Sequence, residues 1–129
     1  MADSILDSVK ATLGIEADDP SFDRELIIYI NGVFTKLTQL GIGPGLEKPS
    51  TIGYKIQDKE NDWMEFLPPT MLLESVKTFM YLSVRLVFDP PSTSYGIAAM
   101  KEQIAEHEWR LNVQREEATW TSPIPSTPF

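Results

Sequence analysis

Few side chains in this chain are of the types that carry chemistry. Its 129 residues include no cysteine and one histidine, His107, which falls on the apolar stripe of a helical pattern. A Cys-His pair or a His-based zinc site needs more of these residues. Glu60 and Asp62 form a carboxylate pair in the polar run DKEND, but on an exposed loop tip their surroundings would not differ as those of an acid–base pair must. The sequence therefore predicts no catalytic residue, no metal site and no cofactor.

Two short loops have the composition of binding loops without the spacing of their ligands. Asp18, Asp19 and Ser21 supply oxygen atoms, but the central Gly and distal Glu of a calcium loop do not follow them. Turn and helix-capping roles are the simpler interpretation of these residues. The run GIGPG, from Gly41, lacks the Lys-Ser/Thr pair that completes a phosphate-binding loop.

Length and charge restrict the class of protein further. A chain of 129 residues has room for one core, and its formal net charge is −8. Without clustered Lys and Arg it is not expected to bind nucleic acid through phosphates. Charged residues interrupt the best apolar run, at 71–91, so no membrane span is predicted. The acidic N-terminus, MADSILDSVK, does not resemble a secretory signal.

Apolar periodicity predicts four helices, over residues 4–13, 22–40, 71–88 and about 95–116. Asp3 or Ser4 can cap the first helix, and Ser21 is the expected cap of the second. The helix from Met71 is apolar on two faces and ends at Pro90-Pro91, so we expect both faces to be covered. Since one small helical domain would not easily hide that much apolar surface, a neighbouring copy is expected to help.

The segment 48–69 has a different pattern. Ile52, Tyr54 and Ile56 alternate with polar or small residues, and Trp63 and Phe66 follow the polar run, which predicts an inserted β-hairpin. The predicted fold is therefore mainly α: a bundle of about four helices in residues 1–117, with this hairpin. An extended Pro-rich tail would occupy residues 118–129.

The C-terminal residues ATWTSPIPSTPF carry no charged side chain. Their prolines favour an extended polyproline II conformation, and a frayed chain end is the alternative. Three large apolar side chains in this strip favour docking onto a partner. The predicted docking residues are Trp120, Pro123, Ile124, Pro125, Pro128 and Phe129.

The order of these features resembles the head–tail connector, or adaptor, family of tailed double-stranded-DNA bacteriophages. The resemblance covers Ser4 to about Arg115, and its strongest parts are QLGIGP (39–44), VKTFMYLSVRLVFDPP (76–91) and EHEWRLN (106–112). These are packing and helix-ending patterns, so they derive their specificity from order and spacing. The Pro-rich tail is less characteristic of the family.

The resemblance implies a structural, non-enzymatic subunit of the virion, made in the host cytoplasm. It implies a homo-oligomeric ring, expected to be dodecameric, that docks on the portal protein and carries the next head-completion, stopper or tail protein. DNA would pass through the ring without sequence-specific binding. The expected ring-interface residues are Tyr54, Ile56, Trp63, Phe66 and Trp109. The expected acidic residues facing the channel are Asp58, Glu60 and Asp62.

Two other classes of function remain open at this stage. One is a cellular helical module that presents a Pro-rich C-terminal ligand to a groove domain, although SPIPSTPF lacks the basic residue that such ligands often carry. The other is a small enzyme or regulator, for which His107 would be the residue to replace. The sequence leaves open which face lines a channel and in which connector layer the chain would sit.

Overall fold

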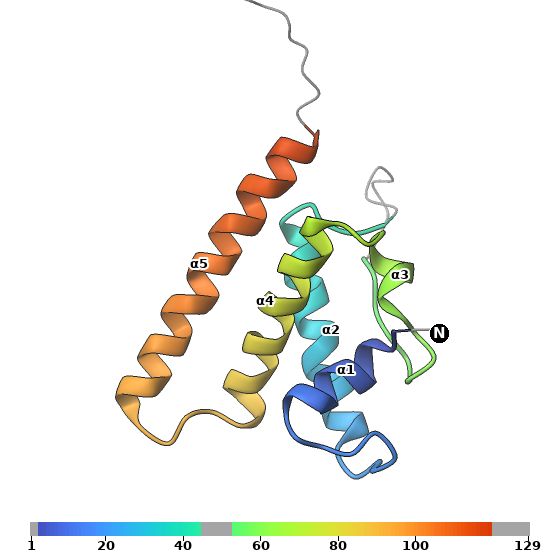
Figure 1. Cartoon of the computed structure of the whole chain (residues 1–129), viewed down its shortest axis with the longest axis vertical. Coiled ribbons are helices and arrows are strands. Elements are labelled where there is room, and N and C mark those ends of the chain that lie inside the picture. The colour runs from blue at the N-terminus through green and yellow to red at the C-terminus, as the bar shows by residue number, and fades with distance from the viewer. Residues whose placement is uncertain (1–2, 45–52, 120–129) are drawn as a thin grey trace, which may run out of the picture.

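The computed structural model of this chain describes residues 3–44 and 53–119, except for the side chains of 115–119. Within these ranges the chain forms helices only: α1 (Ile5–Thr12), α2 (Asp23–Gln39), α3 (Trp63–Phe66), α4 (Met71–Phe88) and α5 (Ser94–Thr119). In Figure 1, α4 lies in the middle of the bundle, with α5 on one side and α1, α2 and α3 on the other.

Local sequence explains where most of these helices begin and end. The Ser4 hydroxyl accepts a hydrogen bond from the Asp7 amide at 3.2 Å, which caps α1 as expected. Thr70 caps α4 in the same way, and α4 ends at Phe88, just before Asp89 and the two prolines. The predicted cap of α2 was wrong: its N-cap position is held by Phe22, which makes no side-chain cap bond.

The core is built around one face of α4. Its buried residues pack with apolar side chains from α1, α2, α3 and α5, and both α2 and α5 contact α4 extensively. The chain therefore covers this face of α4 by itself, whereas Val87 on the same helix is 56% exposed. That a neighbouring copy helps to cover α4 stays a prediction. Each fully buried aliphatic side chain contributes about 1.5–3 kcal/mol. The buried residues of α4 are Leu73, Val76, Phe79, Met80 and Val84.

Residues 53–69 form no strand of the predicted β-hairpin, and its residues 48–52 lie outside the described ones. Trp63–Phe66 is a short helix capped by Asp62, whose carboxylate accepts a hydrogen bond from the Glu65 amide at 3.1 Å. The extended backbone at Ile56 pairs with a side chain instead of a strand. The Asn31 amide accepts a hydrogen bond from Ile56 N at 2.8 Å and donates one to Ile56 O at 3.0 Å. One side-chain amide on α2 thus satisfies both backbone groups that a second strand would have paired.

A buried lysine connects α1 to the start of α2. Lys10 is 1% exposed, and its Nζ donates hydrogen bonds to Ala17 O at 3.0 Å, Asp19 O at 2.7 Å and Asp23 Oδ1 at 2.8 Å. Asp19 and Ser21 hold this linker in a turn, because the Asp19 carboxylate accepts a hydrogen bond from the Ser21 amide at 3.0 Å. The acidic linker therefore has a structural role: it forms a turn whose carbonyl groups bind the buried Lys10.

Candidate assembly surfaces

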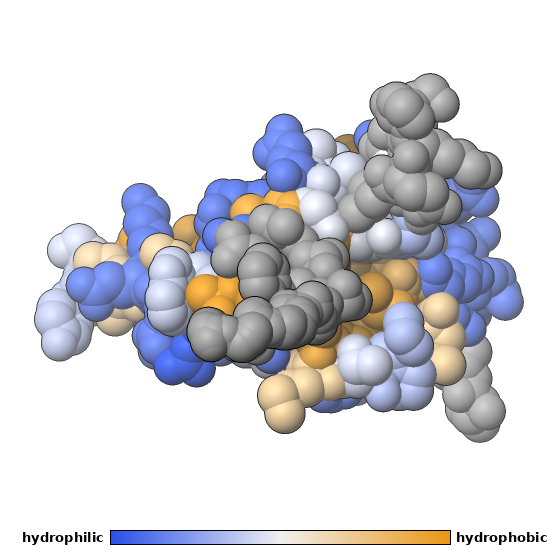
Figure 2. All heavy atoms as spheres, turned by 90° about the horizontal axis from the view of Figure 1, so that it is seen from above, coloured by the Kyte–Doolittle hydropathy of each residue, from blue (hydrophilic) through white to orange (hydrophobic). Residues whose placement is uncertain are grey.

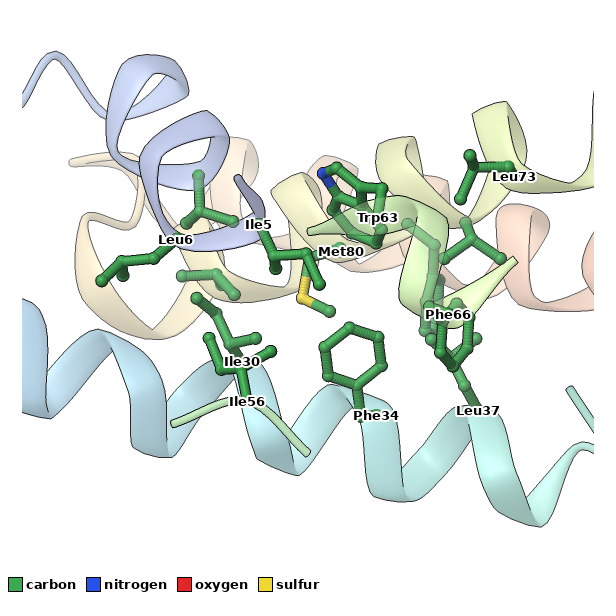
Figure 3. Packing of buried hydrophobic residues seen from close by; sticks show 14 of the residues in the cluster. Ile5, Leu6, Ile30, Phe34, Leu37, Ile56, Trp63, Phe66, Leu73 and Met80 are labelled. Atoms are coloured by element: carbon green, nitrogen blue, oxygen red, sulfur yellow. The ribbon is translucent and has the colours of Figure 1, made fainter. Parts of the chain in front are cut away.

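Four of the five residues expected at a ring interface lie against the subunit's own core. Trp63, Phe66 and Ile56 are 1–2% exposed, and Tyr54 is half-buried. Phe34 on α2 lies 4.8 Å from Phe66 between ring centroids, as can be followed in Figure 3. Its ring centroid lies 5.0 Å from that of Tyr54. The apolar alternation that predicted a hairpin surface marks residues that pack on α2. In this conformation Trp63, Phe66 and Ile56 have almost no surface to offer a neighbouring copy.

Trp63 is also held by polar contacts. Its indole Nε1 donates a hydrogen bond to the Ser8 hydroxyl at 3.0 Å, and its backbone amide donates to Asp3 O at 3.1 Å. Lys77 Nζ lies 5.9 Å from the centroid of the Trp63 ring and forms a 2.8 Å ion pair with Asp3. These bonds join α3 to α1 and α4, so they fix Trp63 as a structural residue.

The fifth interface candidate, Trp109, is exposed. It is 65% accessible, whereas Leu111 on the same helix is fully buried. Ile104 packs against the core from the same side as Leu111. Trp109 is two and five positions away from these residues, so it lies off the face of α5 that packs on the core, at the edge of the groove between α4 and α5. Trp109 is thus an aromatic side chain that the described part of the subunit leaves largely uncovered.

The structure also exposes apolar residues that sequence reasoning missed. Ile28 is 63% exposed on α2 and Val87 is 56% exposed on α4. Both line a groove of about 300 Å³ that also includes Gly32. The signal for Ile28 was available in the run LIIYI, because five consecutive apolar residues on a helix cannot all face the core.

The three acidic residues expected to face a channel lie on one loop before α3. Asp58 and Glu60 are exposed, and the Asp58 carboxylate accepts a hydrogen bond from the Glu60 amide at 2.8 Å. Asp62 is half-buried because it caps α3. The Asn61 side chain braces the loop by accepting a hydrogen bond from the Gln57 amide at 2.7 Å. The loop therefore presents two carboxylates to solvent and uses the third structurally.

Glu65 and Tyr54 form a second polar cluster beside this loop. Glu65 Oε1 accepts hydrogen bonds from Asn61 Nδ2 at 3.0 Å and from the Tyr54 hydroxyl at 2.7 Å. The bond from Asn61, then that from Tyr54, lowers the pKa of Glu65. Burial, followed by the bond to Glu65, raises the pKa of Tyr54. A lowered carboxyl pKa is the reverse of what a general acid needs at neutral pH. The cluster is therefore suited to holding α3 and the loop before it in place.

His107 lies half-buried in a second groove, between α4 and α5, together with Glu74 and Ser75. Among the described residues, no three His, Asp or Glu side chains gather where they could hold a metal ion. No helix in the described ranges is long and apolar enough to cross a membrane. The predicted docking residues Trp120, Pro123, Ile124, Pro125, Pro128 and Phe129 lie outside the described residues.

The fold and these surfaces define a small helical subunit whose exposed apolar residues are suited to contacts with other protein chains. Residues 5–118 match a family described as Phage connector protein, and the chain belongs to this family. It is therefore a structural component of the phage virion with a head–tail connector role. Comparison with curated proteins and with solved structures found no match.

Proposed function

We propose that this chain assembles into a ring, of twelve copies by analogy with the resembling family, that docks on the portal and extends its DNA channel. The family match over residues 5–118 is the observation that carries this proposal. The opposite end of the ring is the platform for the next head-completion, stopper or tail protein. The chain performs this role by assembly and needs no cofactor.

The ring contact joins two different patches on each copy, because ring interfaces are heterologous. Trp109 on α5 is one such patch, with 65% of its surface exposed. The groove beside Ile28, Gly32 and Val87 is the other. Both patches are apolar. The Trp109 side chain is exposed, and the groove is open to a side chain from another copy. Because Trp63, Phe66 and Ile56 are buried, they support the ring by holding the core and not by direct contact.

The exposed carboxylates of Asp58 and Glu60 suit a channel wall. A ring repeats these charges around its axis, and fixed negative charge repels the phosphates of passing DNA. The chain's net charge of −8 favours the same sliding behaviour. In this proposal, the loop before α3 faces the lumen.

The C-terminal residues 118–129 are the part proposed to enter the portal. Proline limits the conformations of the free segment, so less ordering entropy is lost on docking. Trp120, Ile124 and Phe129 are the proposed anchors, each contributing about 1.5–3 kcal/mol when buried. No side chain of the segment carries a charge that would have to be desolvated.

Co-sedimentation with the portal protein of the same virion tests this proposal. The full chain should sediment with portal assemblies and appear as an added ring in electron micrographs. A variant lacking residues 118–129 should keep its helical circular dichroism spectrum but lose portal attachment. A full chain that never sediments with portal would refute the proposal.

A further inference from the structure

One face of α2 is open to solvent and combines positive charge with apolar surface. Ile28 on this face is 63% exposed. A Cβ added at Gly32 meets no atom within 4 Å, so a helix of another copy can approach α2 closely at this point. Arg24 and Ile28 line the same surface cavity. We call the exposed residues at helical spacing the α2 face: Arg24, Ile28, Gly32 and Lys36.

One face of α5 has the opposite charge. Two carboxylates come first along the helix and the Trp109 ring follows, 65% exposed. Figure 2 looks onto the end of the bundle at which α5 finishes, and apolar residues reach the surface at several places in a mostly hydrophilic outline. We call the exposed residues at helical spacing the α5 face: Glu102, Ala105, Glu106 and Trp109.

Each face has one charged side chain that its own subunit does not pair. Within the described ranges, Lys36 pairs with Glu108 at 3.2 Å, and Glu106 pairs with an arginine on its own helix. Arg24 and Glu102 form no ion pair with a described residue. These two opposite charges are therefore available to each other across an interface between copies.

The spacing of these groups agrees when the two helices run parallel. Arg24 lies eight residues, or about 12 Å, before Gly32, and Glu102 lies seven residues, or about 10.5 Å, before Trp109. With the Trp109 ring over Gly32, the long Arg24 side chain can therefore reach Glu102. In the antiparallel arrangement Glu102 would meet Lys36, which is already paired. Within a subunit α2 and α5 run in the same direction (Figure 1), and a ring axis roughly along the bundle keeps them parallel between copies.

We propose that the α5 face of one copy packs in parallel on the α2 face of the next, with Trp109 over Gly32 and Glu102 paired with Arg24. The inference rests on the proposed function for the existence of the ring, and it names the contact that orders the copies. Burial of the Trp109 ring supplies the apolar part of this contact. Two like faces repel each other, so copies join head to tail.

Charge reversal tests the ion pair. Arg24→Glu and Glu102→Arg each place like charges opposite one another, so each variant alone should need about tenfold more protein than the natural chain to complete rings on portal. An equimolar mixture of the two variants restores opposite charges at every contact of an alternating ring, and should recover complete rings in electron micrographs. Lys55→Glu is the matched control, since it changes net charge as Arg24→Glu does, at an exposed site outside both faces.

Cysteine cross-linking tests the same contact in free subunits, because the natural chain has no cysteine. Ile28 and Ala105 each lie four residues before the residues proposed to meet, so they are expected to face each other. A concentrated mixture of the single variants Ile28→Cys and Ala105→Cys should form disulfide-linked heterodimers about tenfold faster than Ile28→Cys with Gln103→Cys. Gln103 is exposed on another face of α5.

Failure of the pairing and failure of the proposed function give different results. If the natural chain forms complete rings on portal and each charge variant alone does so equally well, the pairing is overturned and the portal role is retained. Equal cross-linking rates, or a mixture that does not recover rings, also overturn the pairing. If the natural chain never binds portal, the proposed function is refuted, and selective cross-linking still supports the contact between α2 and α5.

Discussion

Lys10 shows how much one buried charge contributes to this small fold. Its ammonium group makes three hydrogen bonds, two to the middle of the linker between α1 and α2 and one to the first residue of α2. Removing the cation leaves two carbonyls and the Asp23 carboxylate without their partner. We expect Lys10→Met to lower the free energy of unfolding by about 2–4 kcal/mol, measured by urea titration with circular dichroism.

Lys36→Met is the matched control for this prediction. Lys36 forms an ion pair with Glu108 across 3.2 Å, but the two side chains are 51% and 35% exposed. Such pairs contribute less than about 1 kcal/mol, because water and salt screen them. Equal losses of stability in the two variants would mean that burial of Lys10 does not strengthen its contacts.

Glu65 gives the subunit a defined response to acid. Hydrogen bonds from Asn61 and Tyr54 lower its pKa in the folded protein, so the folded state favours the ionised form. Its contribution to stability is present above the unfolded-state pKa of about 4.3 and is lost as the pH falls through the lower, folded-state pKa. We expect Glu65→Gln to flatten the pH dependence of the free energy of unfolding between about pH 3 and pH 5.

This prediction is checked by urea titrations of the natural chain and the variant at several pH values. Glu60→Gln is a suitable control, since Glu60 lies on the exposed loop just before α3 and lacks the hydrogen bonds from Asn61 and Tyr54. A pH profile that is unchanged by Glu65→Gln would contradict the role given to these hydrogen bonds.

At the scale of elements, the segment before α3 depends on Asn31. The side chain of Asn31 makes both of its hydrogen bonds to the backbone of Ile56, which is itself buried. Asn31→Ala should cost about 1–3 kcal/mol, because it leaves an amide and a carbonyl unpaired. The protection of the Ile56 amide against hydrogen exchange should fall with it. Thr35→Ala, one turn along the same helix, is the control. If Asn31→Ala lowers the free energy of unfolding no more than Thr35→Ala does, the two Asn31–Ile56 hydrogen bonds are not stabilising.

Glycines offer a second test at this scale, since two of them have opposite surroundings. A Cβ added at Gly32, inside α2, meets no atom within 4 Å. A Cβ at Gly53 would lie 3.1 Å from Thr38 Cβ, on a backbone with a φ of 95°. We expect Gly32→Ala to stabilise the monomer by about 0.5–1 kcal/mol and Gly53→Ala to destabilise it, measured by urea titration.

Gly32→Ala also reports on the groove beside it. The subunit itself has no packing reason for glycine here, so a helix-weakening residue is retained on an open surface. If the neighbouring copy approaches α2 closely at this point, the variant should be more stable as a monomer and poorer at ring formation. Destabilisation of the monomer would contradict the open environment of Gly32.

Four of the helices were predictable because their apolar spacing is regular, and because Ser4 and Pro90-Pro91 mark two of their ends. The hairpin was not, because residues 53–66 alternate as a half-buried strand does. That pattern records which side chains are buried but not what pairs with the backbone. Here the partner is a side chain on α2, and no local signal links Asn31 to Ile56 across 25 positions.

The candidate surfaces were predictable only in part, for a related reason. Apolar side chains in a segment such as DWMEF can serve a core or an interface, and sequence spacing does not separate these uses. In the structure Trp63 and Phe66 pack inward while Met64, between them, is 58% exposed. Trp109 was identifiable as an exposed residue because it falls off a helical stripe whose other members are well spaced.

At the scale of the whole molecule, we expect a subunit that covers its own core to be stable as a monomer. Only its surface patches then have to drive the proposed assembly, because the described part of the subunit already packs its own core.

Trp109 should matter more for assembly of the proposed ring than for folding of the subunit. Because Trp109 is 65% exposed in the subunit, Trp109→Ala should change the free energy of unfolding by less than about 0.5 kcal/mol. At an interface, loss of an anchoring Trp costs about 2 kcal/mol or more, roughly 30-fold in affinity per contact. Portal-bound rings of this variant should accordingly be incomplete in electron micrographs.

Tyr95→Ala is the matched control, since Tyr95 is 85% exposed on the same helix. Complete rings with both variants would remove Trp109 from the interface, and incomplete rings with both would show that the contact extends along all of α5.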